Sequence, residues 1–195
     1  DMTNVTALAY LGLRVPDLAA WRTFAVDLLG MQATPESDDT DLYLRLDDRS
    51  HRLHLTEGEP GLAHLGFEVD TPTELRDLAD HLRSTGVEVT EDPALAKVRR
   101  VHDLVRCQDP AGNGVELVCG QLGARSPFAS PRGVTFKTGT QGLGHVFMLV
   151  PDGDAANSFY VDGLGFRLSD TIDLGPIEGV FLHCNPRHHT LAYGA

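Results

Sequence analysis

The sequence predicts an α+β fold built from repeated βαβββ modules, and two observations carry this prediction. Residues 8–31 align with residues 143–166 without a gap, at an offset of 135 positions. The segment between the two copies, residues 64–119, shows the same order of strand, helix and strands. Such self-similarity indicates a fold assembled from copies of one supersecondary unit. The identical pairs of the repeat are Leu8/Leu143, Val15/Val150, Pro16/Pro151, Asp17/Asp152, Ala20/Ala155, Phe24/Phe159, Val26/Val161, Asp27/Asp162, Leu29/Leu164 and Gly30/Gly165.

Each copy opens with an apolar strand that leads into an amphipathic helix. An aspartate directly after a proline is placed to cap the first helical turn, because its carboxylate can accept a backbone N–H. An aromatic side chain is expected on the core face of the helix, and a glycine ends it. These residues are Asp17, Phe24 and Gly30 in the first copy and Asp152, Phe159 and Gly165 in the later one.

Short β-runs complete each unit. Residues 41–55 and 179–193 alternate around a central turn, which predicts two hairpins. In the middle unit, strand 64–70 is followed by a helix from about Thr73 to Ser84, which Gly86 ends. The rest of that unit, through a turn at residues 109–114, is expected to be strands.

The repeats predict the domain organisation. Residues 1–120 are expected to form an N-terminal domain of two modules, and residues 121–140, rich in Gly, Ser, Thr and Pro, a linker. Residues 141–195 are expected to be the first module of a C-terminal catalytic domain. Because such modules normally close in pairs, we expect the sequence to be a fragment whose fourth module would begin just after Ala195.

Composition narrows the classes of partner. The 195 residues carry 28 acidic and 16 basic side chains, a formal net charge of -12, which argues against nucleic acid or an anionic membrane surface. No apolar stretch approaches the roughly 18 residues of a membrane span. The three cysteines, Cys107, Cys119 and Cys184, show no CxxC spacing, so we expect small core residues with reduced thiols and a cytoplasmic location.

Four histidines near the C-terminal end are candidates for chemistry. Strand alternation places His145 on one face with Phe147 and Leu149. Taken alone, His145 is more often a core or edge residue than a ligand, and His183 and His188 fit a solvated hairpin. Because adjacent strand residues face opposite ways, at most one of His188 and His189 can share a pocket with His145. A mononuclear iron site also needs a carboxylate, and no obvious one follows.

Several motifs together resemble a known family. Residues 142–152, the aromatic pair at 159–160, and residues 164–170 and 181–192 are similar to the type I extradiol ring-cleaving dioxygenases of the vicinal oxygen chelate superfamily. The Asn-x-Arg-His-His core of the last motif is specific. The βαβββ pattern itself is not specific, because glyoxalases and bleomycin-resistance proteins share it.

The resemblance implies roles for individual residues. His145 would be the first of three iron ligands, and the second histidine and the glutamate ligand would lie beyond residue 195. His189 would be a catalytic acid/base that does not bind metal. The side chains expected to line the oxygen and catechol pockets are Phe147, Leu174, Phe181 and Ala192.

The N-terminal modules are expected to be a scaffold without metal. His64 starts the second module where a ligand would sit in a fourth. The residues that would have to bind a metal together with His64 are Tyr10 and Val118, and these do not complete a ligand set. Glu116 is expected to be an exposed or capping carboxylate.

The implied activity is extradiol cleavage of a bulky catechol resembling 2,3-dihydroxybiphenyl, with Fe(II), or alternatively Mn(II), and O2. The implied partners are this small aromatic diol and further copies of the chain in a homo-oligomer. Two alternatives share the fold: a glyoxalase-like isomerase using Zn or Ni, and a non-catalytic protein that binds an aromatic ligand as bleomycin-resistance proteins do. Metal analysis with a ring-cleavage assay separates the three.

Overall fold

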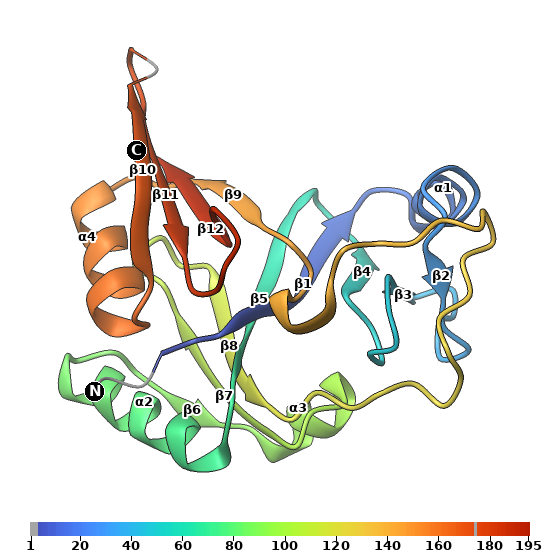
Figure 1. Cartoon of the computed structure of the whole chain (residues 1–195), viewed down its shortest axis with the longest axis horizontal. Helices are drawn as coiled ribbons and strands as arrows, with labels where there is room; N and C mark the ends of the chain where they lie inside the picture. Colours follow the sequence, from blue (N-terminus) through green and yellow to red (C-terminus); the bar gives the residue numbers. More distant parts are fainter. Residues whose placement is uncertain (1–3, 174) are drawn as a thin grey trace.

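The structure is a computed structural model that describes residues 4–173 and 175–195 (Figure 1). The described strands form an eight-stranded sheet in the order β2-β3-β4-β1-β5-β8-β7-β6 and a four-stranded sheet in the order β10-β11-β12-β9. The larger sheet contains β1 (Ala7–Val15), β2 (Gln32–Ala33), β3 (Asp41–Arg45), β4 (Leu53–Glu57), β5 (Gly61–Val69), β6 (Thr90–Glu91), β7 (Asp103–Gln108) and β8 (Gly114–Cys119). The smaller sheet contains β9 (Val146–Leu149), β10 (Arg167–Asp173), β11 (Glu178–His183) and β12 (Leu191–Gly194).

The three predicted modules are present, and they share one pairing rule. The first strand of each module pairs in parallel with its last strand: β1 with β4, β5 with β8, and β9 with β12. Antiparallel pairing of β1 with β5 joins the first two modules into one sheet. The α+β prediction is therefore confirmed. The helical segments are α1 (Leu18–Thr23), η1 (Phe24–Leu28), α2 (Pro72–Ser84), α3 (Pro93–Arg99), η2 (Gly139–Gln141), α4 (Gly153–Asn157) and η3 (Ser158–Gly163).

The repeated helix starts are built alike. The Asp17 carboxylate accepts the Ala20 backbone N–H at 2.8 Å, and the Asp152 carboxylate accepts that of Ala155 at 2.9 Å. Gly30 and Gly165 end their helices with φ of 78° and 75°, in the left-handed region that favours glycine. The caps and glycine stops predicted from the repeat are confirmed.

The aromatic residue of the repeat differs between the copies. Phe159 is 6% exposed and belongs to the main hydrophobic core, as expected. Phe24 is 43% exposed and packs edge-on against Trp21, so the prediction that it faces the core is wrong. In the third module the helix packs Phe159 into the main core, whereas in the first module the helix packs Leu18 and Ala25 into a separate core cluster that does not include Phe24.

Helix α3 was not expected, because the part of this unit that follows Gly86 was predicted to form strands only. Asp92 caps it by accepting the Leu95 N–H at 2.9 Å, and Pro93 occupies its first turn. The helix ends at Arg100, whose φ is 58°. Ala96 packs with Tyr10 and Val118 on the face of the large sheet that lies opposite α2. Helix α3 thereby brings Arg99 onto this face, called here the concave face.

The main core connects the two sheets. It includes Phe67 and Leu78 of the second module together with Tyr160 and Leu182 of the third. The buried Tyr160 hydroxyl donates to the Asp109 carboxylate at 2.8 Å. Figure 1 shows the third module, orange to red, beside the strands of the second. Cys107 and Cys119 are buried, Cys184 is half-buried, and all three are free thiols. Within the described ranges, none of the helices has the length and apolar character needed to span a membrane.

Replacing Gly12 with alanine is expected to destabilise the N-terminal sheet. Gly12 pairs with His64, and a Cβ at Gly12 would lie 2.0 Å from the His64 ring. That ring is buried and cannot swing into solvent, so the added methyl is expected to cost about 1–3 kcal/mol or more. Urea unfolding of Gly12→Ala measures this loss. Gly58→Ala is the control, because a Cβ there meets its nearest neighbour at 3.6 Å. Equal stability of the two variants would contradict the close approach.

Candidate active site

The candidate pocket residues lie on one face of the four-stranded sheet. Ala192 of β12 pairs with Phe147 of β9 on one side and with Phe181 of β11 on the other, so the three side chains form a row. Along the strand, His145, Phe147 and Leu149 are exposed, whereas Met148 and Val150 are buried. The predicted alternation is confirmed. Leu174 lies outside the described residues.

His189 is the histidine of the C-terminal hairpin that meets His145. The two ring centroids are 4.4 Å apart, and the His189 ring packs edge-on against Phe181 at 5.1 Å. His188 also contacts His189, with 3.1 Å between their Nδ1 atoms. Because one Nδ1 must accept the proton that the other donates, at least one of these two imidazoles is neutral.

The environment favours the neutral form of His189. Partial burial lowers the pKa of His189 from its ordinary value, and the nearby His145 and His188 lower it further. A neutral imidazole can accept a proton near pH 7. The arrangement therefore provides a base beside an aromatic-walled face.

The first half of the Asn-x-Arg-His-His motif holds the hairpin in place. The Asn185 amide donates to the Thr6 carbonyl at 3.0 Å, and its Oδ1 accepts the Arg187 backbone N–H at 3.0 Å. The Arg187 guanidinium donates to the carbonyls of Gln141 and Lys137. These bonds connect the hairpin to the N-terminal segment and to the linker. No structural role was predicted for Asn185 or Arg187; the turn signal at Asn185-Pro186 was the available clue.

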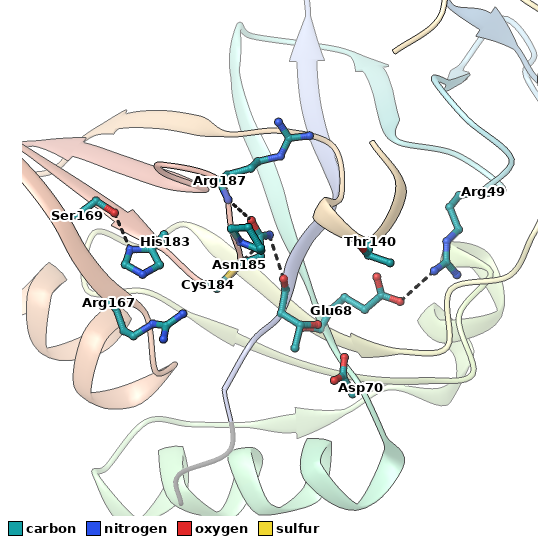
Figure 2. Close-up of a pocket in the computed structure, with 12 residues that line it drawn as sticks. Arg49, Glu68, Asp70, Thr140, Arg167, Ser169, His183, Cys184, Asn185 and Arg187 are labelled. Atoms are coloured by element: carbon teal, nitrogen blue, oxygen red, sulfur yellow. Dashed lines mark hydrogen bonds and ion pairs between the residues drawn. The ribbon is translucent and has the colours of Figure 1, made fainter. Parts of the chain in front are cut away.

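A cavity of about 780 Å³ lies beside the same hairpin but does not include His145 or His189 (Figure 2). Arg49 and Glu68 form an ion pair at its rim, and His183 faces it. The Ser169 hydroxyl donates to the His188 carbonyl and therefore receives the His183 Nδ1 proton. His183 does not act as a base on this serine, so the pair is a structural contact. The lining residues are Thr6, Arg49, Glu68, Asp70, Thr140, Arg167, Ser169, His183, Cys184, Asn185, Pro186 and Arg187.

The described residues do not provide a complete metal site. Among residues 4–173 and 175–195, no group of three or more His, Cys, Asp or Glu side chains could hold a metal ion. His145 and His189 are close together, but no carboxylate joins them in such a group. The donor set therefore fits one ligand, His145, of the three that the family resemblance implies.

The concave face of the large sheet holds a second polar cluster, and it corrects the expectations for Glu116 and Val118. Glu116 is 4% exposed; it accepts the Tyr10 hydroxyl at 2.6 Å and two guanidinium bonds from Arg99 at 2.9 Å. Burial, then the charge of Glu116, raises the pKa of Tyr10 well above its usual value, so Tyr10 stays protonated. Glu116 pairs with Gly66, which follows His64 by two residues on β5, and its carboxylate accepts the Tyr10 hydroxyl. Glu116, and not Val118, is therefore the side chain that lies with Tyr10 and His64.

Two protein families match parts of the sequence. Residues 8–58 match the family described as "Dihydroxybiphenyl dioxygenase BphC D1". Residues 142–195 match the "Glyoxalase/Bleomycin resistance protein/Dioxygenase superfamily".

Relatives with assigned names cover nearly the whole chain. The biphenyl-2,3-diol 1,2-dioxygenase of Paraburkholderia xenovorans is 42% identical over 201 residues, which cover 98% of this chain and 67% of the relative. The iron-dependent extradiol dioxygenase of Rhodococcus jostii is 38% identical over 203 residues, covering 97% of this chain and 68% of the relative. A crystal structure of BphC, a halotolerant catechol dioxygenase, superposes with a TM-score of 0.91 at 37% identity, covering 98% of this chain and 65% of that one. The chain thus spans about two thirds of the length of these relatives.

Proposed function

This chain belongs to the extradiol ring-cleaving dioxygenases, an iron-dependent group within the vicinal oxygen chelate fold, and from this premise we propose that it serves in opening the ring of a bulky catechol with O2. The observation that carries the proposal is the contact of His145 with His189 beside the row formed by Phe147, Ala192 and Phe181. Relatives of the chain are named for two kinds of two-ring diol, biphenyl-2,3-diol and 1,2-dihydroxynaphthalene, which supports a bulky substrate.

Each residue of the site has a proposed role. His145 contributes one ligand to the metal, which we propose to be Fe(II) in preference to Mn(II) because a relative is named for its iron dependence. When bound, the iron would offer open coordination positions to both substrate hydroxyls and to O2. Phe147, Phe181 and Ala192 form an apolar wall for the ring. Leu174 is proposed to join this wall.

The chain's own chemistry rests on His189. As a neutral imidazole it accepts a proton from a catechol hydroxyl through the ring nitrogen that carries no hydrogen. For this role the His189 Nδ1 donates its hydrogen to the His188 Nδ1, which leaves the His189 Nε2 free as the proton acceptor. Once protonated, His189 can return that proton to an oxygen of the opening ring. The apolar wall limits access of water to this exchange.

The domain division predicted from the repeats remains part of the proposal. Residues 1–120 would form the N-terminal domain, residues 121–140 the linker and residues 141–195 the first module of the catalytic domain, which agrees with two separate sheets. We also propose assembly into a homo-oligomer and, from the free thiols, a cytoplasmic location.

The test compares His145→Ala with His102→Ala in the whole protein, loaded with Fe(II) without oxygen. His102 is an exposed histidine far from the site in sequence, which makes it a matched control. With 2,3-dihydroxybiphenyl and O2, the parent and His102→Ala should form the ring-opened product, whereas His145→Ala should lose both bound iron and activity. Unchanged iron content and turnover in His145→Ala would reject the proposed site. Ligand binding without oxygen uptake by the parent protein would instead favour a binding module.

A further inference from the structure

The concave face of the large sheet repeats the geometry of the candidate active site. Residues 8–15 (LAYLGLRV) align with residues 62–69 (LAHLGFEV), and residues 143–150 (LGHVFMLV) align with both. Tyr10, His64 and His145 therefore occupy equivalent positions in the three modules. Tyr10 and His64 face each other across the antiparallel pair, each ring lying over a glycine of the opposite strand.

The last strand of each module supplies a second equivalent position. Two residues after Tyr10, Gly12 pairs with His54; two residues after His64, Gly66 pairs with Glu116. In the third module the corresponding residue is Ala192, opposite Phe147. The concave face thus brings together His54, His64 and Glu116, which are two imidazoles and one carboxylate. These donor types suit mononuclear iron and other divalent transition metals, but as they stand around Arg99 the three side chains do not form a group that could hold a metal ion.

Arg99 lies in the middle of this donor set. Its guanidinium makes two bonds of 2.9 Å to the Glu116 carboxylate and lies 3.3 Å from the His64 Nδ1 and 3.5 Å from the His54 Nδ1. Arg99 is 8% exposed, so its charge is held inside the protein. A guanidinium has no acceptor, so both Nδ1 atoms present lone pairs to it. The same lone pairs would bind a metal ion.

Burial favours the neutral form of both imidazoles that face Arg99. Burial, followed by the charge of Arg99, lowers the pKa of His64 to about 2. Burial also lowers the pKa of His54, whose Nε2 is hydrogen-bonded to Asp41 at 2.6 Å. Such a carboxylate behind a histidine is the usual support of a metal-bound imidazole. In addition, His64 Nε2 is buried and has no hydrogen-bond partner among the described residues.

We propose that the Arg99 guanidinium is the permanent cation of a disabled metal site, and that its removal lets His54, His64 and Glu116 bind a divalent transition metal. Arg99 comes from α3, which belongs to the second module, so the site is closed by an element of the same domain. With the guanidinium present the three donors stand around it at 2.9–3.5 Å. Because the Glu116, His64 and His54 contacts go to different nitrogens of the guanidinium, all three donors would have to move toward one common point to reach the roughly 2.0–2.2 Å of a metal bond.

The experiment measures cobalt(II) bound by Arg99→Ala and by the parent protein after metal removal. The expected result is one more equivalent of cobalt per chain in Arg99→Ala, with the visible absorption of cobalt bound to imidazole nitrogen. The double variant Arg99→Ala/His64→Ala should lose that extra equivalent. Arg83→Ala, which removes an exposed arginine from a similar ion pair, should gain none. Any metal bound at the proposed active site is common to all four proteins and cancels in the comparison.

Folding of the variant is controlled separately. Arg99→Ala leaves Glu116 buried without its partner, so it is refolded both with and without cobalt and checked by circular dichroism. Folding that depends on cobalt supports the proposal. If Arg99→Ala does not fold in either condition, Arg99→Gln replaces it, because the neutral amide can still donate to Glu116. A folded Arg99→Ala, or a folded Arg99→Gln in its place, that binds no more cobalt than the parent overturns the proposal. Failure of the ring-cleavage test would leave this measurement unaffected.

Discussion

Replacing Glu116 with alanine is expected to destabilise the protein by about 3–5 kcal/mol, the usual cost of removing one partner of a buried ion pair. The loss leaves the Arg99 guanidinium buried and unpaired and removes the acceptor of the Tyr10 hydroxyl. Tyr10 and Arg99 are both buried, so neither group can turn to water without opening the sheet. Urea unfolding of Glu116→Ala at pH 7 measures the loss.

Asp80→Ala is the matched control for Glu116→Ala. Asp80 also pairs with an arginine, Arg83, but the two side chains are 73% and 40% exposed. Because water screens such a pair, its loss is expected to cost at most about 1 kcal/mol. Equal destabilisation of the two variants would mean that the Arg99–Glu116 pair is open to solvent and that the concave face is not closed.

Replacing His189 with alanine is expected to slow ring cleavage by about 100-fold or more while the iron content stays unchanged, because His189 moves protons and does not bind the metal. The lowered pKa of His189 means that its base form persists to lower pH than that of an ordinary histidine. The acidic limb of kcat/KM in the parent should therefore lie below about pH 6.5, and this limb should disappear in His189→Ala. Turnover as a function of pH and metal analysis of the whole protein test both statements.

His183→Ala controls for the loss of a histidine from the same hairpin. His183 lines the cavity of Figure 2, whose lining does not include His145 or His189. The His183→Ala variant should retain the pH dependence of kcat/KM of the parent protein. A drop in iron content in His189→Ala, or unchanged turnover, would remove the acid/base role.

Much of the architecture was predictable because it is encoded between near neighbours. Asp17 and Asp152 cap helices that begin within three residues of them, and Gly30 and Gly165 end those helices. The alternation around His145 is likewise local, so the face that carries Phe147 could be assigned before the sheet was known. The repeat supplied the module order.

Helix α3 marks the limit of that reasoning. Asp92 and Pro93 are signals for a helix start, but the unit was expected to continue as strands after the helix that ends before Gly86. The error concealed the position of Arg99, since a strand would have pointed alternate residues away from the sheet. The structural roles of Asn185 and Arg187 were also missed, because their partners lie in the N-terminal segment and the linker.

The sequence by itself determined the number and order of the modules, the helix caps and the four histidines available to the third module. Only the tertiary structure decided which charges are buried. Glu116 meets Tyr10 across 106 positions of chain and meets Arg99 across 17, and it pairs with both because β1, β8 and α3 converge on one face. The physical reason is that burying a carboxylate is costly unless hydrogen-bond donors and an opposite charge contact it in the folded protein. The residue pattern within one segment does not specify which distant segments supply those partners.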